Sequence, residues 1–289
     1  MILEVKDLAF SYQNNPGSML FRDVNFTLRK GEIFSILGAN GAGKSTLLNC
    51  LANLLHPAKG QILLNGHSLM QSSLKNIART IGYVPQSHTP AYAYSVEEFI
   101  VMGRAPYLGL CAQPREKDYQ LVREAMEELG ITHLSDRPYT ELSGGERQQV
   151  IIARAIVQQP DIIMLDEPTN HLDYGNQLRM MQLIKRLAKK GYGVIITSHM
   201  PDHVLLLGGM VGMLGTDGRL QVGSTEEIMT EENLKRLYDI DVHMVYIKEV
   251  GRKVCAAGKM EGGSIPGDPA VSRGEKDESS ENNERNENN

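Results

Sequence analysis

The chain has 289 residues, of which 30 are Lys or Arg and 35 are Asp or Glu, so its formal net charge is −5. This balance argues against a protein whose main role is to coat nucleic acid, and an apolar content of 41% predicts a sizeable core. No uncharged apolar run reaches the roughly 18 residues of a membrane span. Glu4, Lys6 and Asp7 argue against a secretory signal, and three isolated cysteines exclude a disulfide or zinc scaffold. We therefore expect an intracellular protein.

The first zone of the chain, residues 1–86, is rich in β-forming residues and contains one helical pattern. The helix is predicted over residues 44–55, where His56-Pro57 ends it. Apolar and alternating segments predict four strands, over 4–12, 20–28, 32–37 and 61–64.

The middle zone has helical periodicity, and the last zone alternates strands with a helix. The middle zone predicts helices over 95–102, 115–129 and 144–158. The last zone predicts a strand, a helix, a strand and a hairpin that turns at Asp217-Gly218, over 162–165, 177–190, 193–197 and 212–222. Strand–helix alternation with nearly continuous apolar strands predicts an α/β fold with a mostly parallel sheet, into which the helical zone is inserted. After residue 258 the polar composition predicts a disordered tail, 258–289.

The segment Gly38-Ala-Asn-Gly-Ala-Gly-Lys-Ser-Thr46 fits the phosphate-binding pattern G-x-x-x-x-G-K-[ST]. Its glycines let the backbone turn N–H groups around phosphate oxygens, and the helix that begins there adds its positive end. Lys44 would place a charge on the β- and γ-phosphates, and Ser45 would bind Mg²⁺. The alternative is a glycine-rich turn with an incidental lysine. The predicted strand before the segment and the helix after it favour the phosphate loop.

The strand predicted over 162–165 ends in two carboxylates, Asp166 and Glu167. Because adjacent strand residues point to opposite faces, we expect separate roles for them. Asp166 is expected to hold the Mg²⁺ shell. Glu167, at the end of the sheet where ligands bind, is expected to polarise the attacking water. Many strands end in an acidic residue, so this interpretation depends on the phosphate loop.

The stretch Leu142-Ser-Gly-Gly-Glu-Arg-Gln-Gln149 places two glycines in the first turn of a helix. Each costs about 1 kcal/mol relative to alanine. Ser143 and Glu146 have the spacing of a capping box, so a well-capped helix start is the simplest explanation. That explanation leaves Gly144 and Gly145 without a purpose, whereas a phosphate that approaches the helix amides would require both.

Together, these motifs resemble the ATPase subunit of an ATP-binding cassette (ABC) transporter over residues 1–245. The serine–glycine–glycine signature between the phosphate loop and the acidic strand separates this family from other P-loop proteins. The resemblance implies a P-loop NTPase with an N-terminal antiparallel β subdomain and an inserted helical subdomain. Its implied parts are a RecA-like core, a helical insertion and a C-terminal extension, at 1–86 with 160–222, 87–159 and 223–245. It also implies a head-to-tail dimer, in which each ATP lies between the phosphate loop of one copy and the signature helix of the other.

Four further roles follow from the resemblance alone. Tyr12 matches the aromatic residue that stacks on adenine, and Gln86 matches the glutamine that joins the Mg²⁺ and water site to the helical insertion. Asp173 matches the aspartate at the dimer seam, and His199 matches the switch histidine that contacts the γ-phosphate. Taken singly, each would be an ordinary core, loop or structural residue. Glu146 is a departure, since many members have glutamine there.

The implied site falls into three groups, with ATP and Mg²⁺ as cofactors. The residues expected to act in catalysis are Glu167, His199 and Gln86. Those expected to bind Mg²⁺ are Ser45, Gln86 and Asp166. Those expected to bind nucleotide are Tyr12, Gly38, Asn40, Gly41, Gly43, Lys44, Ser45, Thr46, Ser143, Gly144, Gly145 and Asp173.

The resemblance also implies partners and a location. In the family, the segment after the glutamine grips a membrane permease, here about residues 87–110; its apolar and aromatic side chains fit a docking groove or a plain core. Residues 94–104 and 230–242 resemble importers of iron–siderophore, haem, cobalamin and, in relatives, molybdate or tungstate. We therefore expect a homodimer bound to permease subunits at the cytoplasmic face of the membrane, served by a solute-binding protein, with no nucleic-acid partner. The residues do not record the cargo.

Three other functions fit parts of the pattern. Soluble cassette ATPases that act on DNA or ribosomes generally carry coiled coils or two cassettes, and neither is found in this sequence. A P-loop GTPase needs an N-K-x-D motif, which is not found, and neither a GTPase nor a small-molecule kinase explains residues 143–146. An exporter ATPase keeps the fold, but residues 230–242 argue against it.

Overall fold

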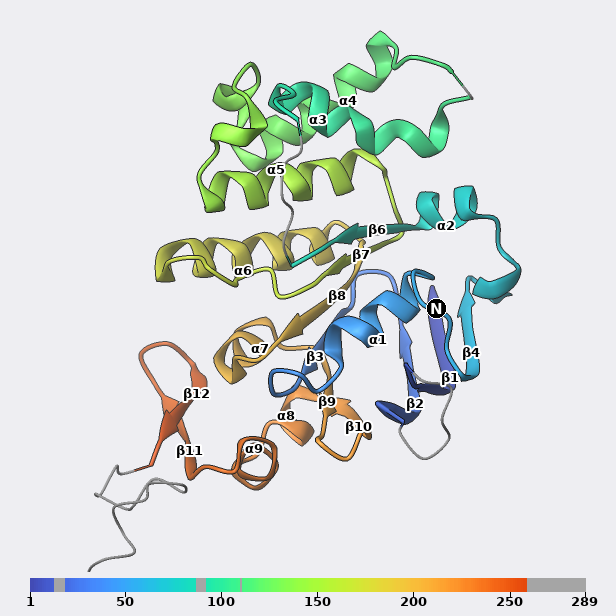
Figure 1. Cartoon of the computed structure of the whole chain (residues 1–289). Coiled ribbons are helices and arrows are strands. Elements are labelled where there is room, and N and C mark those ends of the chain that lie inside the picture. The colour runs from blue at the N-terminus through green and yellow to red at the C-terminus, as the bar shows by residue number, and fades with distance from the viewer. Residues whose placement is uncertain (13–18, 87–91, 110, 259–289) are drawn as a thin grey trace, which may run out of the picture.

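The computed structural model describes residues 1–12, 19–86, 92–109 and 111–258. Its strands form a six-stranded sheet, a four-stranded sheet and a hairpin (Figure 1). The strands are β1 (Leu3–Phe10), β2 (Phe21–Leu28), β3 (Ile33–Leu37), β4 (Lys59–Leu64), β5 (His67–Ser68), β6 (Ile81–Val84), β7 (Ile162–Leu165), β8 (Gly193–Ser198), β9 (Met210–Leu214), β10 (Leu220–Ser224), β11 (Val242–Ile247) and β12 (Arg252–Ala257).

The α-helices lie between these strands in sequence, and several short 3-10 turns join them. The helices are α1 (Lys44–Leu51), α2 (Leu74–Thr80), α3 (Val96–Val101), α4 (Glu116–Leu129), α5 (Gly144–Val157), α6 (Tyr174–Lys189), α7 (Pro201–Leu207), α8 (Thr225–Ile228) and α9 (Glu231–Tyr238). Within the described residues, no helix is both long and apolar enough to cross a membrane.

The six-stranded sheet has the order β10-β9-β3-β8-β7-β6, and every neighbouring pair is parallel except β9 with β10. Its central strands β3, β7 and β8 are buried along their whole length. This burial explains their continuous apolar sequences. Because the three strands are parallel neighbours, their carboxyl ends meet at one edge of the sheet. The predicted α/β fold with a mostly parallel sheet is confirmed.

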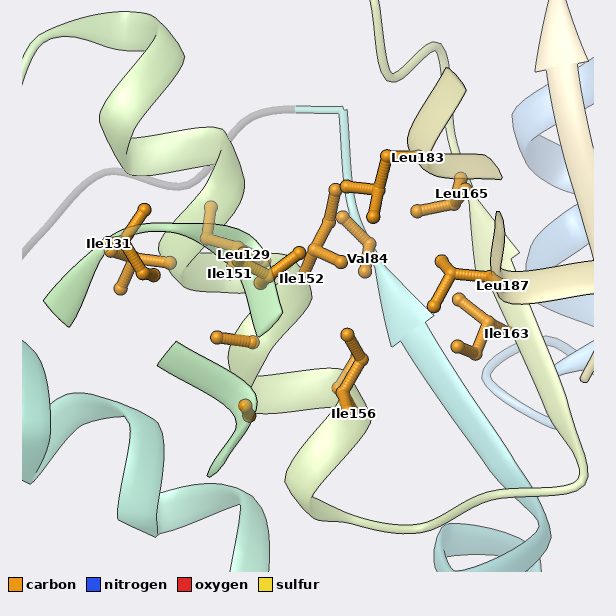
Figure 2. Packing of buried hydrophobic residues seen from close by; sticks show 14 of the residues in the cluster. Val84, Leu129, Ile131, Ile151, Ile152, Ile156, Ile163, Leu165, Leu183 and Leu187 are labelled. Atoms are coloured by element: carbon orange, nitrogen blue, oxygen red, sulfur yellow. The ribbon is translucent and has the colours of Figure 1, made fainter. Parts of the chain in front are cut away.

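Side chains from the two faces of this sheet enter different cores, as the alternation along β7 shows. Ile163 and Leu165 pack with α5 and α6 (Figure 2). Ile162 and Met164 pack with α1 and the four-stranded sheet. That second sheet has the order β2-β1-β4-β5 and is antiparallel, as expected for the amino-terminal part. Helix α1 is therefore held between the two sheets, and its amino end is fixed beside the edge where β3 ends.

Helices α3, α4 and α5 pack on one another as an α-helical layer beside the outer strand β6 (Figure 1). The segment that follows α3 passes very close to α5. A Cβ on Gly103 would lie 2.2 Å from the Arg154 carbonyl oxygen, so this position requires glycine. The buried guanidinium of Arg104 closes this contact. Its Nε donates to Asp118 Oδ1 at 3.1 Å, and its Nη1 donates to the Val157 carbonyl oxygen at 2.8 Å. The ion pair thus ties the segment that follows α3 to α4, and the hydrogen bond to Val157 ties it to the end of α5.

The carboxyl-terminal part adds α8, α9 and the β11–β12 hairpin to the β9 side of the large sheet. Leu234 and Leu237 of α9 share a core with Val204 of α7 and Val211 of β9. The hairpin packs on α7 through β12. Regular structure therefore continues to Ala257.

Several sequence predictions of local structure need correction. The helix predicted over 44–55 ends at Leu51, because the backbone turns at Asn53 in the left-handed region before the proline is reached. The helix predicted from residue 177 begins at Tyr174, where the Asp173 side chain accepts a hydrogen bond from Asn176 N. Helices α2, α7, α8 and α9, strands β5 and β6 and the β11–β12 hairpin were not predicted. The predicted disordered tail lies outside the described residues, apart from its first residue.

Candidate functional site

A cavity of about 530 Å³ lies at the edge where β3, β7 and β8 end. This volume is in the range of small-molecule sites. It is lined by Tyr12, Leu20, Asn40, Gly41, Gly43, Lys44, Ser45, Thr46, Gln86, Glu167, Asn170 and His199. Segments far apart in sequence are thus brought together by the parallel order of the strands.

The loop between β3 and α1 takes a shape that requires glycine at two positions. Gly41 and Gly43 have φ angles of 81° and 100°, in the left-handed region that other residues avoid. Gly43 also leaves no room for a side chain, since a Cβ there would lie 2.9 Å from Leu20 Cγ. The loop therefore leads into α1, whose first residues, Lys44, Ser45 and Thr46, line the cavity. A helix start is a favourable place for an anion.

Lys44 lies at the floor of this loop and is only 4% exposed. Its ammonium donates to the carbonyl oxygens of Gly38 and Ala39, at 2.9 and 3.0 Å. It also lies 3.2 Å from Glu167 Oε1. A buried cation held by backbone oxygens at a helix start is suited to contact phosphate.

Asp166 lies directly below the start of α1. Its Oδ1 accepts hydrogen bonds from Ser45 Oγ at 3.0 Å and from Thr197 Oγ1 at 2.6 Å, and the residue is 4% exposed. A carboxylate and a hydroxyl in contact supply the hard oxygen ligands that Mg²⁺ prefers. The residues at this point therefore fit a magnesium ion.

Glu167 has a left-handed backbone, with φ of 43°, which is unfavourable for a residue with a side chain. Its backbone N–H donates to Thr197 Oγ1 at 2.8 Å, which helps to hold this conformation. Its Oε2 lies 3.4 Å from both Gln86 Nε2 and His199 Nδ1. The prediction that Asp166 and Glu167 point to opposite faces is wrong. The strand ends at Leu165, and the left-handed turn brings both carboxylates to the start of α1.

Tyr12 stands at the rim of the cavity and is 67% exposed. Its hydroxyl forms a hydrogen bond of 2.7 Å with Thr46 Oγ1, and its ring contacts the edge of Phe10 at a centroid distance of 4.9 Å. The ring is thus fixed at two points, and its exposed surface is available for stacking against a planar group.

The signature residues do not line this cavity. Ser143 caps α5, and its backbone N–H donates to Glu146 Oε2 at 2.8 Å, which confirms the capping box. Hydrogen bonds from the Ser143 hydroxyl and then from its backbone N–H lower the pKa of Glu146 below the ordinary value. A Cβ on Gly144 would meet no atom of the described residues within 4 Å, outside its own neighbours and helix backbone.

Gly145 and Asn176 line a second hollow of about 210 Å³ between α5 and α6. Asp173, which caps α6, lies beside Asn176 and not in the first cavity.

Three residues of the site were missed from the sequence. Thr197 links Asp166 to the backbone of Glu167; its signal was a polar residue inside an otherwise apolar strand. Leu20 and Asn170 line the cavity, but Leu20 reaches it from the strand β2 side and carries no motif. Asn170 lies inside the Thr169-Asn-His-Leu-Asp segment, of which only the aspartate was selected.

The fold and the cavity define a P-loop nucleotide-binding protein. The family model described as "ABC transporter" matches residues 21–170. An uncharacterized ABC transporter ATP-binding protein of Haemophilus influenzae is 41% identical over 82% of this chain and 89% of its own length. The molybdate import ATP-binding protein MolC of the same organism is 38% identical over 82% of this chain and 88% of its own length.

A solved structure of an ABC transporter classed as metal-chelate type, in an inward-facing conformation, superposes with a TM-score of 0.79. It is 35% identical and covers 89% of this chain and 97% of its own. This chain therefore belongs to the ABC transporter family, as an ATP-binding cassette that hydrolyses ATP.

Proposed function

We propose that this chain is the ATPase subunit of an importer for a metal chelate or a molybdate-like oxyanion, with iron–siderophore, haem and cobalamin among the candidate cargoes. The relative that imports molybdate and the structural neighbour of metal-chelate type support this cargo class. The observation that carries the catalytic part is the meeting of Lys44, Glu167 and His199 in one cavity.

In the proposed mechanism, Lys44 and the loop amides bind the phosphates, and Tyr12 stacks on the adenine ring. Ser45, Gln86 and Asp166 would hold Mg²⁺, which neutralises phosphate charge when bound. Glu167 accepts a proton from the attacking water, and His199, whose Nδ1 lies 3.4 Å from Glu167 Oε2, contacts the terminal phosphate. Water attack in line with the leaving oxygen then requires little covalent chemistry from the protein, only position and charge.

We further propose that each ATP is completed by a second copy of the chain. Ser143 caps α5 and Gly144 and Gly145 form its first turn, and the space around a Cβ on Gly144 is open, yet these residues lie outside the cavity. A partner's signature helix placed over the terminal phosphate would use both features, with Asp173 at the seam. Hydrolysis removes the charge that draws the two helix ends together, so the dimer reopens and moves its permease.

The proposed assembly is a homodimer bound to integral permease subunits at the cytoplasmic face of the membrane, supplied by a solute-binding protein, with no nucleic-acid partner. The apolar surface near Tyr94 and Met102, both about 40% exposed, supports the permease contact; residues 87–91 and 110 of the segment expected to make it lie outside the described residues. The proposed parts are a core of 1–86 and 160–222, an insertion of 87–159 and an extension of 223–245.

The importer is tested by purifying the affinity-tagged full chain from detergent-solubilised native membranes. We expect a polytopic membrane protein to co-purify. In proteoliposomes loaded with ATP, the complex should take up labelled ferric chelate or molybdate, and the complex with Lys44→Ala should not. Uptake that is equal in the two complexes, or the absence of a membrane partner, would contradict the proposal.

A further inference from the structure

The switch histidine is in contact with a part of the chain that the proposed mechanism does not use. The hydroxyl of Tyr238, the last residue of α9, donates a hydrogen bond of 2.7 Å to the backbone carbonyl oxygen of His199. Tyr238 lies 39 positions further along the sequence. A residue of the carboxyl-terminal part thus contacts the loop that presents His199 to Glu167.

That loop is short and is fixed at both ends. Ser198 ends β8, and its hydroxyl accepts a hydrogen bond of 3.0 Å from the backbone N–H of Met200. Pro201 begins α7, and its ring fixes the backbone there. Both polar groups of the peptide that follows His199 are hydrogen-bonded: Ser198 Oγ accepts from its N–H, and its carbonyl oxygen accepts from the Tyr238 hydroxyl. Tyr238 is thus the residue from outside this loop that holds the backbone carbonyl of His199.

Tyr238 belongs to a segment that we call the C-terminal clasp, residues 230–257, which comprises α9, β11 and β12. Its ring packs on the core that joins α7 to α9. The clasp also contacts α7 directly, because the Cys255 backbone N–H donates to Asp202 Oδ1 at 3.0 Å. The backbone N–H of Met244 donates to Glu231 Oε1 at 2.7 Å, which joins the hairpin to α9. The clasp therefore holds both Tyr238 and the helix that follows His199.

The hydroxyl of Tyr238 keeps its proton, and so remains a hydrogen-bond donor, at every pH near neutral. Burial raises its pKa well above the ordinary value of 10.0. The bond is therefore not expected to change with pH between about 6 and 9.

We propose that Tyr238 is a positioning residue for ATP hydrolysis, which keeps the imidazole of His199 directed toward Glu167 and the terminal phosphate. This inference depends on the role proposed above for His199. It assigns the C-terminal clasp a share in catalysis, although no clasp residue lines the nucleotide cavity.

The test is Tyr238→Phe in the full chain, which removes one oxygen and leaves the ring packed in its core. Loss of one hydrogen bond that acts on catalysis should lower kcat by about fivefold. The KM for ATP should change by less than about twofold, because Tyr238 does not touch the nucleotide site. The matched control is Tyr246→Phe on the exposed surface of β11, which should retain wild-type kcat.

Two measurements separate positioning from a general structural effect. In a His199→Ala background, Tyr238→Phe should cause no further loss in single-turnover rate, because it acts through His199. In spectra of histidine-labelled protein, the signal absent from His199→Ala identifies His199. That signal should move in Tyr238→Phe and stay in place in Tyr246→Phe.

The outcomes distinguish this inference from the proposed function. If His199→Ala loses turnover while Tyr238→Phe keeps wild-type kcat and an unmoved histidine signal, the positioning role is wrong and the site stands. A loss in Tyr238→Phe that is matched by a rise in KM, or that persists in the His199→Ala background, also overturns it. If His199→Ala itself turns over ATP normally, the role proposed for His199 is the one that fails.

Discussion

Glu167 has an unfavourable backbone conformation, and its carboxylate contacts Lys44, Gln86 and His199 in the cavity. The left-handed conformation costs on the order of 1–3 kcal/mol in a residue with a side chain, and Thr197 and Lys44 offset part of this cost by bonding to its backbone N–H and its carboxylate. The unfavourable conformation of Glu167 therefore indicates that its position serves the chemistry of the site and not the stability of the chain.

Glu167→Gln is expected to bind ATP but to hydrolyse it at least about 100-fold more slowly, because the amide cannot accept the proton of water. ATP-bound dimers should then accumulate, which light scattering after gel filtration would detect. Glu124→Gln, on the exposed side of α4, is the matched control. Turnover by Glu167→Gln equal to that of the control would reject the assignment.

Lys44→Ala is expected to raise the dissociation constant for ATP by about 10- to 100-fold, the value of a charged hydrogen bond lost in a partly closed site. Titration calorimetry measures this directly. Lys189→Ala, at the exposed end of α6, should bind as the wild type does. Equal affinity of the two variants would contradict the phosphate-loop assignment.

At the scale of elements, the buried Arg104–Asp118 pair joins the segment that follows α3 to α4 within the helical layer. Asp118 is 1% exposed and Arg104 6%. The Arg115 backbone N–H, and then the Arg104 guanidinium, lower the pKa of Asp118 against the opposing effect of burial. Removing the carboxylate leaves a buried cation without its partner, which is costly.

Asp118→Ala should therefore lower the free energy of unfolding by about 3 kcal/mol at pH 7, measured by urea denaturation. A lowered folded pKa means that the contribution of this carboxylate is complete above its ordinary pKa and is lost as the pH falls through the lowered value. The difference between wild type and variant should thus shrink in acid. Asp136→Ala, on the exposed surface of the same layer, should be nearly neutral. A difference in unfolding free energy that stays constant as the pH falls would contradict this pH dependence.

At the scale of the whole molecule, the separation of the signature residues from the phosphate cavity makes a dimer testable by mixing inactive variants. Lys44→Ala disables the phosphate loop of a copy, and Ser143→Arg obstructs its signature helix. A mixed head-to-tail dimer would contain one site with both defects and one intact site. A site contained within one copy would remain inactive in every mixture.

Equal mixing of these two variants should restore about a quarter of wild-type turnover, because half of random dimers are mixed and each has one intact site of two. Mixing Lys44→Ala with Glu167→Gln is the matched control, since both defects lie on the phosphate-loop side and no intact site arises. Turnover that does not exceed that of the control would rule out the shared site.

Much of the fold could be predicted from local sequence patterns, because many of its helices and strands depend on residues that are close together in the sequence. Strand β7 was predicted with its observed bounds, since four buried apolar residues bounded by a proline-containing turn and two carboxylates leave little choice. Strand β6 and helix α2 were missed. Gly82 interrupts the strand pattern, and it is required because a Cβ there would lie 3.1 Å from Pro160. That neighbour is distant in sequence, so nothing in the local pattern indicated it.

What the sequence determined alone is the phosphate loop, whose glycines, lysine and serine act through the geometry of a single turn and helix start. It also determined the family, because several such motifs occur in one order. Tertiary structure decided the rest: the left-handed turn that brings Glu167 to Lys44, the threonine that supports it, and the hydroxyl of Tyr238 on the backbone of His199. These contacts join residues 30 to 123 positions apart. Their geometry depends on how sheets and helices pack, which no local pattern of residues specifies.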